Sequence, residues 1–364
     1  MSSSLPLPTL LSHALVAFTI EFDNEAERGI PHYTTRHGAT TSALPKPWLV
    51  SMAMYLNCIP FLDDDGMSAR ELVRAARAKT NFHGMVRWGY ITIKPDLSHS
   101  RPKPPKADWI VRPTAAGRTA QEIWRPLIDV IEDHWKQRFG SKQVEQLISS
   151  LGALERRFEL DLPDCLPILT HGLYSNTAKY RTKSAQSAGP IEARLPVLLA
   201  RALLALALEY ESKSELSLAM SANAVRVLDR DDIPVRELPR ISGVSKEAVA
   251  VALAFLAKRG YAVVESNSSR IRVAHLTTKG LKAQRAHAKR LQEIEQQWRE
   301  RFGNLTDSLT ESLAPFVGGG MAANSPLFAG LGPPPNGWRA KVRRPDTLPH
   351  FPMVLHRGGY PDGS

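Results

Sequence analysis

One sequence pattern occurs twice in this chain of 364 residues. The block Trp135–Gly140 returns as Trp298–Gly303, 163 residues later (135 to 298), and the front segment Leu10–Asp23 aligns with Leu198–Glu211. Repeated blocks of this kind indicate that one structural unit has been duplicated. Because the matching blocks keep the same order along the chain, we interpret the sequence as two tandem copies of one fold.

The two copies and their insertions define the expected domain organisation. The first unit covers residues 1–176, a polar and basic linker covers 177–197, and the second unit covers 198–364. Long insertions at 27–48 in the first copy and 318–342 in the second have the compositions typical of loops. We therefore expect two units of similar shape, each of which carries one long loop.

The second copy has the clearer pattern of secondary structure. Apolar spacing predicts helices at 198–211, 216–228, 246–259, 279–302 and 305–316, and β-rich segments at 261–265 and 271–276 predict a hairpin. The first of these helices has no wide polar face, so we expect it to be buried between the two units.

Local signals mark where the helices of the second copy begin and end. Asp231 and Asp232 followed by Pro234 are typical of a helix start, and predict a short helix that ends near Arg240. Ser245 is expected to cap the helix at 246–259, and Gly260 to end that helix in the left-handed conformation. The acidic run Asp63-Asp64-Asp65 occupies the matching place in the first copy, and we interpret both runs as caps rather than as cation sites.

This order of helix, helix, tight turn, helix and hairpin resembles the MarR family of winged helix-turn-helix regulators. The matching residues are Arg236–Leu238, Gly243–Ser245, Leu256, Lys258–Tyr261 and Leu276–Gly280, which precede the paired long helices. The resemblance implies a mainly α fold with small β-wings (α+β). It also implies that the two tandem units form a pseudo-dimer within one chain, joined through their first and last helices.

The resemblance implies that the third helix and the wing of each unit touch double-stranded DNA. The candidates are Lys79, Thr80, Asn81, His83 and Arg87 at the third helix of the first copy, Arg101, Lys103 and Lys106 in its proline-stiffened wing, and Lys246, Arg270 and Arg272 in the second copy. Basic and amide side chains of this kind bind phosphates and base edges. We expect the first copy to contribute most of the DNA contacts.

The third helix of the second copy departs from this pattern. The positions expected to read bases hold Ala250, Val251, Ala254 and Phe255, which cannot form hydrogen bonds with base edges. We interpret this apolar face as packed against another part of the protein. This leaves open the alternative that the chain is a winged-helix protein that binds proteins or small ligands without reading a DNA sequence.

Both copies end in a similar tail, with His171 in the first and Arg357 in the second at matching positions. Proline and glycine fix such a tail in an irregular path, which suits a strap that ties each unit to the helical body. The alternative is that the tail forms a wall of a pocket for a small aromatic effector, because MarR-like proteins bind such ligands between the dimer helices and the winged module.

Composition limits the remaining classes of function. A net charge of +11 favours polyanionic partners, and two cysteines are too few for a disulfide framework or a cysteine-rich metal site. The eleven histidines form no recognisable ligand or catalytic pattern. Together with these limits, the resemblance to the MarR family implies a cytoplasmic bacterial transcription regulator, and we expect that it is not an enzyme and uses no cofactor or metal. Whether whole chains pair further into a homodimer stays open.

Overall fold

The computed structural model describes residues 5–29, 52–77, 80, 82–96, 104–164, 194–321, 324–335, 340 and 346–353. The described chain is mainly helical and contains two small three-stranded antiparallel sheets. None of the described helices is long and apolar enough to cross a membrane.

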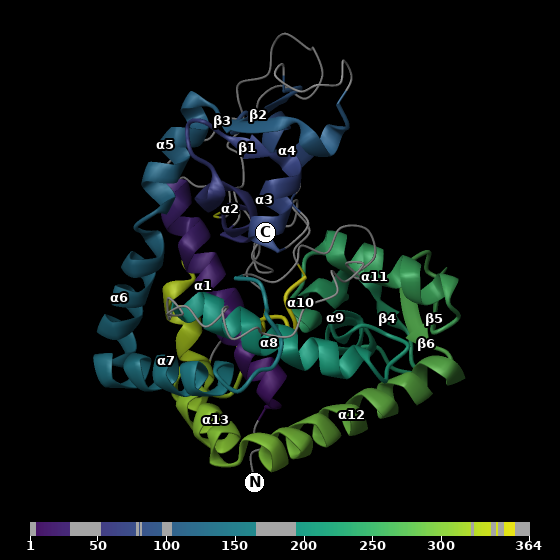
Figure 1. Cartoon of the computed structure of the whole chain (residues 1–364). Helices are drawn as coiled ribbons and strands as arrows, with labels where there is room; N and C mark the ends of the chain where they lie inside the picture. The colour runs from purple at the N-terminus through teal and green to yellow at the C-terminus, as the bar shows by residue number, and fades with distance from the viewer. Residues whose placement is uncertain are drawn as a thin grey trace.

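Six helices form a central body (Figure 1). They are α1 (Leu7–Gly29), α6 (Leu127–Phe139), α7 (Ser141–Glu155), α8 (Leu195–Glu211), α12 (Thr278–Phe302) and α13 (Asn304–Val317). Helix α1 packs against α6, α8 and α13, and α8 packs against α7 and α12. Nearly the whole surface of α1 and of α8 is buried, which explains why neither sequence shows a polar face. The burial expected for residues 198–211 is confirmed, although the helix begins at Leu195, inside the expected linker.

The first module lies beyond one end of this body, above it in Figure 1. It consists of α2 (Met52–Cys58), η1 (Ile59–Phe61), β1 (Met67–Ser68), α3 (Ala69–Ala76), α4 (Phe82–Arg87), β2 (Ile91–Lys94), η2 (Lys106–Asp108), β3 (Ile110–Pro113) and α5 (Ala115–Trp124). Its sheet has the strand order β1-β3-β2. Ser68 caps α3 through a reciprocal pair of bonds with Glu71, so the acidic run at 63–65 is not the cap.

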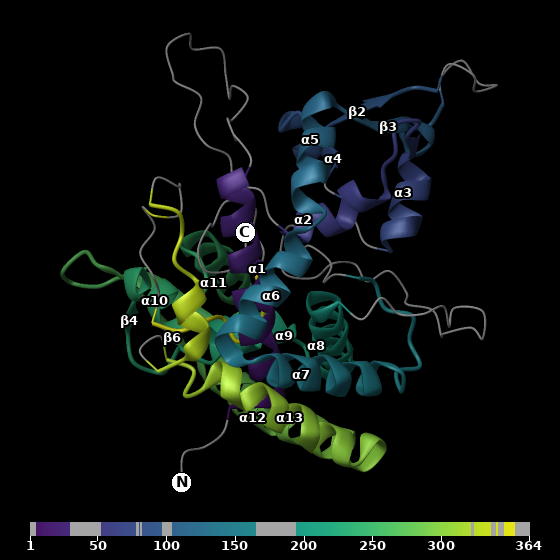
Figure 2. The ribbon, with the colours of Figure 1, turned by 90° about the vertical axis from the view of Figure 1, so that its left-hand side faces the viewer.

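The second module lies on another side of the body, and Figure 2 shows the two modules well apart. It consists of α9 (Leu218–Met220), the π-turn η4 (Ser221–Val225), β4 (Ile233–Pro234), η5 (Val235–Glu237), α10 (Leu238–Ser242), α11 (Lys246–Lys258), β5 (Ala262–Ser266) and β6 (Arg272–Leu276), and a short turn η6 (Pro326–Gly330) follows later in the chain. Its sheet has the order β4-β6-β5, which matches the order in the first module.

Local sequence signals predicted α11 and its neighbours well. The Ser245 hydroxyl accepts a hydrogen bond from the Ala248 amide as the N-cap of α11, and Gly260 follows the helix with a φ of 72°. The hairpin and both long C-terminal helices are confirmed within two residues at each end. The prediction that a helix starts at Asp231-Asp232 is wrong. The following residues pair with β6 as strand β4, and α10 begins only at Leu238.

Corresponding hydrogen bonds recur in the two halves of the body. The indole Nε1 of Trp135 donates to Glu21 over 3.0 Å, and that of Trp298 donates to Glu209 over 2.9 Å. In each half an arginine three residues after the tryptophan also pairs with the same carboxylate. These contacts fix the long helix of each half on the first helix of that half.

Two further bonds cross between the halves. The Leu7 amide at the start of α1 donates to Glu295 of α12 over 2.7 Å, and the Leu195 amide at the start of α8 donates to Glu132 of α6 over 2.8 Å. Each carboxylate satisfies a free N–H group of a helix N-terminus, where negative charge is favourable. Each half thus caps the first helix of the other half.

Candidate functional site

The DNA-contact residues predicted in the first module differ in their exposure to solvent. His83 on α4 and Lys106 on η2 are exposed, and Arg87 is half-buried with its guanidinium 5.7 Å from the Trp88 ring. Thr80 is only 7 % exposed, so in this structure it offers little surface to DNA. Lys79, Asn81, Arg101 and Lys103 lie outside the described residues.

The three residues predicted in the second module are all exposed. Lys246 begins α11, and Arg270 and Arg272 lie at the tip of the β5–β6 hairpin. The carboxamide oxygen of Asn267 closes this tip by accepting bonds from the Ser269 and Ile271 amides, over 3.0 and 2.9 Å. Arg270 has a φ of 59°, a left-handed conformation held within this turn. The turn therefore holds two basic side chains at the free end of the sheet.

The apolar outer face of α11, which we expected to pack against another part of the protein, is largely uncovered among the described residues. Ala250 and Ala254 are exposed, and Val251 and Phe255 are half-buried. The opposite face of the helix makes the core contacts, through residues such as Leu253 and Leu256. The module therefore presents an apolar helix face to solvent.

A cavity of about 380 Å³ lies where the two halves meet. Its walls come from the start of α1, from α9 and η4, from the middle of α12, from α13 and from the C-terminal segment at 346–353. The lining residues are Leu5, Pro6, Leu7, Pro8, Thr9, Leu218, Ala222, Arg226, His287, Ala288, Leu291, Gln292, Glu295, Arg299, Thr306, Thr310 and His350. Mostly apolar walls with a few convergent polar groups are typical of small-molecule sites.

Arg226 is the buried cationic group of this cavity, whereas Arg299 in the same lining is exposed and pairs with Asp307. Its Nε donates to the Ala222 carbonyl over 2.8 Å, whereas its Nη2 is buried and has no hydrogen-bond partner among the described residues. Burial lowers the pKa of this guanidinium to about 10, which still leaves it charged near neutral pH. The nearby carboxylate of Glu295 already accepts the Leu7 amide. A buried cation without a carboxylate partner is costly, so this side chain is suited to pair with an anion.

Three buried histidines surround Arg226. Burial is the main reason why the pKa values are lowered, to about 4 for His287, to about 3 for His13 and well below the usual value for His350. The His287 ring lies 3.1 Å from the Tyr210 hydroxyl, and the His13 and His350 rings meet edge to face at 5.4 Å. These rings are neutral near pH 7, and the two that line the cavity, His287 and His350, can hydrogen-bond to a ligand without adding charge.

The histidine cluster was missed from the sequence. Its members come from α1, α12 and the C-terminal segment, at positions 13, 287 and 350, so no spacing rule connects them. The tail residues His171 and Arg357, which suggested a pocket wall, lie outside the described residues, whereas His350 of the same tail lines the cavity.

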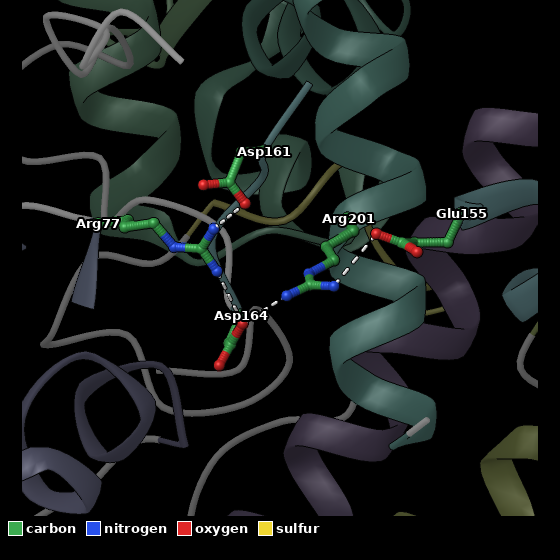
Figure 3. Close-up of polar contacts among 5 residues, drawn as sticks. All are labelled: Arg77, Glu155, Asp161, Asp164 and Arg201. Carbon is green, nitrogen blue, oxygen red and sulfur yellow. Dashed lines mark hydrogen bonds and ion pairs between the residues drawn. The ribbon is translucent and has the colours of Figure 1, made fainter. Parts of the chain in front are cut away.

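In the first half, the corresponding tail position forms ion pairs instead (Figure 3). The Asp164 carboxylate forms ion pairs with Arg201 of α8, at an N–O distance of 2.7 Å, and with Arg77 of the first module, at 3.3 Å. Arg77 also pairs with Asp161, and Arg201 with the buried Glu155 over 3.2 Å. These five side chains connect the end of α3 to the helical body.

The acidic runs have structural partners other than helix caps. Asp63 accepts the Gly66 amide over 2.8 Å, and Asp64 pairs with Arg118 over 3.2 Å. In the second half, Asp232 contacts His275 over 2.8 Å. The interpretation of both runs as caps is therefore wrong.

Comparisons with protein-family models, with curated proteins and with solved structures find no match to this chain.

Proposed function

We propose that this protein is a DNA-binding transcription regulator, built from two MarR-like winged helix-turn-helix units that form a pseudo-dimer within one chain. The observation that carries the proposal is the recurrence of one architecture in both halves. Each half has short helices, a sheet with a β-hairpin and a long helix that contacts the other half. A pair of related modules on a shared body suits two half-sites on one duplex.

Exposed basic side chains in both modules support this function. His83 and Lys106 in the first module and Lys246, Arg270 and Arg272 in the second are accessible to phosphates. Lys79, Asn81, Arg101 and Lys103 remain part of the proposed interface. The apolar outer face of α11 gives no hydrogen bonds to bases, so in this proposal the second module contacts mainly the phosphate backbone.

The first test is the salt dependence of binding to a labelled duplex, measured by fluorescence anisotropy. With about four phosphate contacts, affinity should fall by about 10²-fold between 50 and 200 mM salt, because binding releases condensed counterions. The double variant Arg270→Ser/Arg272→Ser should reduce the slope of log affinity against log salt by about 2. Lys289→Gln on α12, outside both sheets, is the matched control. A salt-independent affinity, or equal slopes for the double variant and the wild type, would contradict the proposal.

The cavity supports regulation by a small anion, such as an aromatic carboxylate. Its walls come from both halves, so a ligand that prefers one arrangement of the halves shifts the population of that arrangement. The Nη2 of Arg226, which has no hydrogen-bond partner in the described part of the chain, provides the charge-assisted bond. The apolar side chains at the start of α1 contact the body of the ligand.

Binding of benzoate as a probe, measured by calorimetry, tests this pocket. Arg226→Met should weaken binding by about 10- to 100-fold, because one hydrogen bond between charged groups is lost. Arg299→Met is the matched control, since Arg299 lines the same cavity but pairs with Asp307 over 3.0 Å. Equal losses in both variants would show that Arg226 has no special role.

The exposed apolar face of α11 favours a second candidate function, a protein-interaction module that retains the winged-helix shape. In that case the duplex binds weakly and the wing arginines are irrelevant. The Arg270→Ser/Arg272→Ser variant would then behave as the wild type with DNA, whereas Ala254→Asp would disrupt the protein complex.

A further inference from the structure

Three potential metal ligands meet on the sheet of the second module. Asp232 directly precedes β4, Glu265 lies in β5 and His275 lies in β6. Their ligand atoms all lie within 4.8 Å of one another, and the His275 Nδ1 is 2.8 Å from a carboxylate oxygen of Asp232. Among the described residues, this is the cluster in which three such groups from different strands converge.

The strand register explains this convergence. Ile233 is opposite Ala274, which places Asp232 opposite His275 on the neighbouring strand. On the other side, Val263 is opposite His275, and Glu265 lies two residues further along β5. Because side chains alternate between faces with a period of two, Glu265 is on the same face as His275. The three ligands are thus held by three paired strands rather than by one loop.

The donor set favours a particular class of ion. One imidazole nitrogen with two carboxylates suits Zn²⁺ and similar first-row transition ions, whereas Mg²⁺ and Ca²⁺ prefer oxygen ligands alone. Asp232 and Glu265 are exposed and His275 is partly exposed, so an ion reaches the site from solvent and water completes its coordination. The three ligand atoms already lie within 4.8 Å of one another, so small side-chain movements bring them into one coordination sphere.

The matching positions of the first sheet carry the opposite charge. Met67 is opposite Val111, so Gly66 is opposite Arg112 and takes the place of Asp232, while Arg112 takes that of His275. The equivalent of Glu265 is Lys94 in β2, because Thr92 is opposite Arg112. Lys94 and Arg112 are exposed. One sheet therefore has two fixed positive charges where the other has two carboxylates and an imidazole.

We propose that Asp232, Glu265 and His275 bind a divalent transition-metal ion such as Zn²⁺, which neutralises the two carboxylates beside the hairpin that carries Arg270 and Arg272. Without the ion, the carboxylates repel an approaching phosphate. With the ion bound, the surface charge of the second sheet becomes similar to the positive surface charge of the first sheet. The effect on DNA rests on the proposed function, whereas the metal site does not.

The metal site is tested on the full chain by Zn²⁺ titration in competition with a chromogenic chelator. His275→Ala and Glu265→Gln should each weaken Zn²⁺ binding by about tenfold or more, with unchanged far-ultraviolet circular dichroism. His83→Ala, which removes an exposed histidine from the first module, is the matched control and should bind as the wild type does. Equal Zn²⁺ affinity in the wild type and in His275→Ala would overturn the proposal, as would equal affinity of the wild type for Zn²⁺ and Mg²⁺.

A second measurement separates this site from the proposed function. Zn²⁺ should raise the affinity of the wild type for a duplex about tenfold at 50 mM salt, and should leave Glu265→Gln nearly unchanged. If the duplex does not bind under any condition, the proposed function fails and the chelator titration alone decides the metal site. Zn²⁺ could bind at Asp232, Glu265 and His275 and yet change the DNA affinity of the wild type and of Glu265→Gln by the same factor. In that case the proposed effect of the ion on DNA binding is wrong.

Discussion

Lowering the pH from 6.5 to 4.5 should reduce the free energy of unfolding by about 5 kcal/mol, a large part of the stability of a typical domain. The cause is the cluster of His13, His287 and His350, whose burial holds their pKa values far below 6.5 in the folded chain. Each such histidine lowers the free energy of unfolding by about 1.4 kcal/mol per pH unit. This holds at pH values where the unfolded chain binds the proton and the folded chain does not.

The direction follows from the proton balance of the two states. Above pH 6.5 the histidines are neutral in both states and contribute nothing. As the pH falls below 6.5, they bind protons in the unfolded chain, while His287 stays neutral when folded until about pH 4 and His13 until about pH 3. Stability is therefore present above pH 6.5 and declines towards pH 4. The positive charge of Arg226 acts in the same direction on His287 and His350.

Glu211 opposes this trend. Burial raises the pKa of its carboxyl group to about 7, so the folded chain keeps a proton that the unfolded chain loses above pH 4.5. Its contribution to stability is present below pH 4.5 and is lost as the pH rises to 7. Burial also raises the pKa of the Glu132 carboxyl group, which opposes the histidines in the same direction. The three histidines still outweigh these carboxyl groups, and the net loss is about 2.5 kcal/mol per pH unit between pH 6.5 and 4.5.

Urea unfolding followed by circular dichroism at pH 6.5, 5.5 and 4.5 measures this slope. His13→Leu should reduce the slope by about 1.4 kcal/mol per pH unit, because one buried titrating group is removed. His83→Leu, at an exposed histidine, should leave the slope unchanged. A wild-type stability that is constant over this pH range would contradict the burial of the cluster.

The parts of the fold that the sequence predicted are those with local causes. Helix periodicity, the Ser245 cap and Gly260 act within one or two turns, so α11 and the hairpin could be located from a few residues each. Strand β4 could not, because it is two residues long and exists only through its pairing with β6. The same pairing brings Asp232 to His275, which is why the acidic run was misread as a cap.

The cavity was beyond sequence reasoning because its groups meet only through tertiary packing. Arg226 and His350 lie in different elements, and nothing near either residue marks it as part of a site. One signal was present in the sequence, since the offset of 163 residues also relates Glu132 to Glu295. That pair identifies the contacts that cap α8 and α1.

Replacing Trp298 by alanine should lower the free energy of unfolding by about 4 kcal/mol, and Trp135→Ala by a similar amount. Both indoles are fully buried, and each bonds to a carboxylate of the first helix in its own half. Removal of either ring leaves a cavity and deprives a buried or partly buried carboxylate of a donor. Trp109→Ala in the first module, where the ring is half-buried, should cost clearly less.

The two tryptophans also join the halves, and this determines the shape of the unfolding curve. Trp135 stacks on Phe316 of α13 at 5.6 Å, and Trp298 lies 5.7 Å from Phe158, which follows α7. Each ring thus packs against an aromatic side chain of the opposite half, within one continuous hydrophobic core. Either variant should therefore unfold in a single transition, shifted to lower urea and with the same midpoint by fluorescence and by circular dichroism. Two separate transitions, with only the mutated half destabilised, would mean that the halves fold independently and that the contacts between them contribute little to stability.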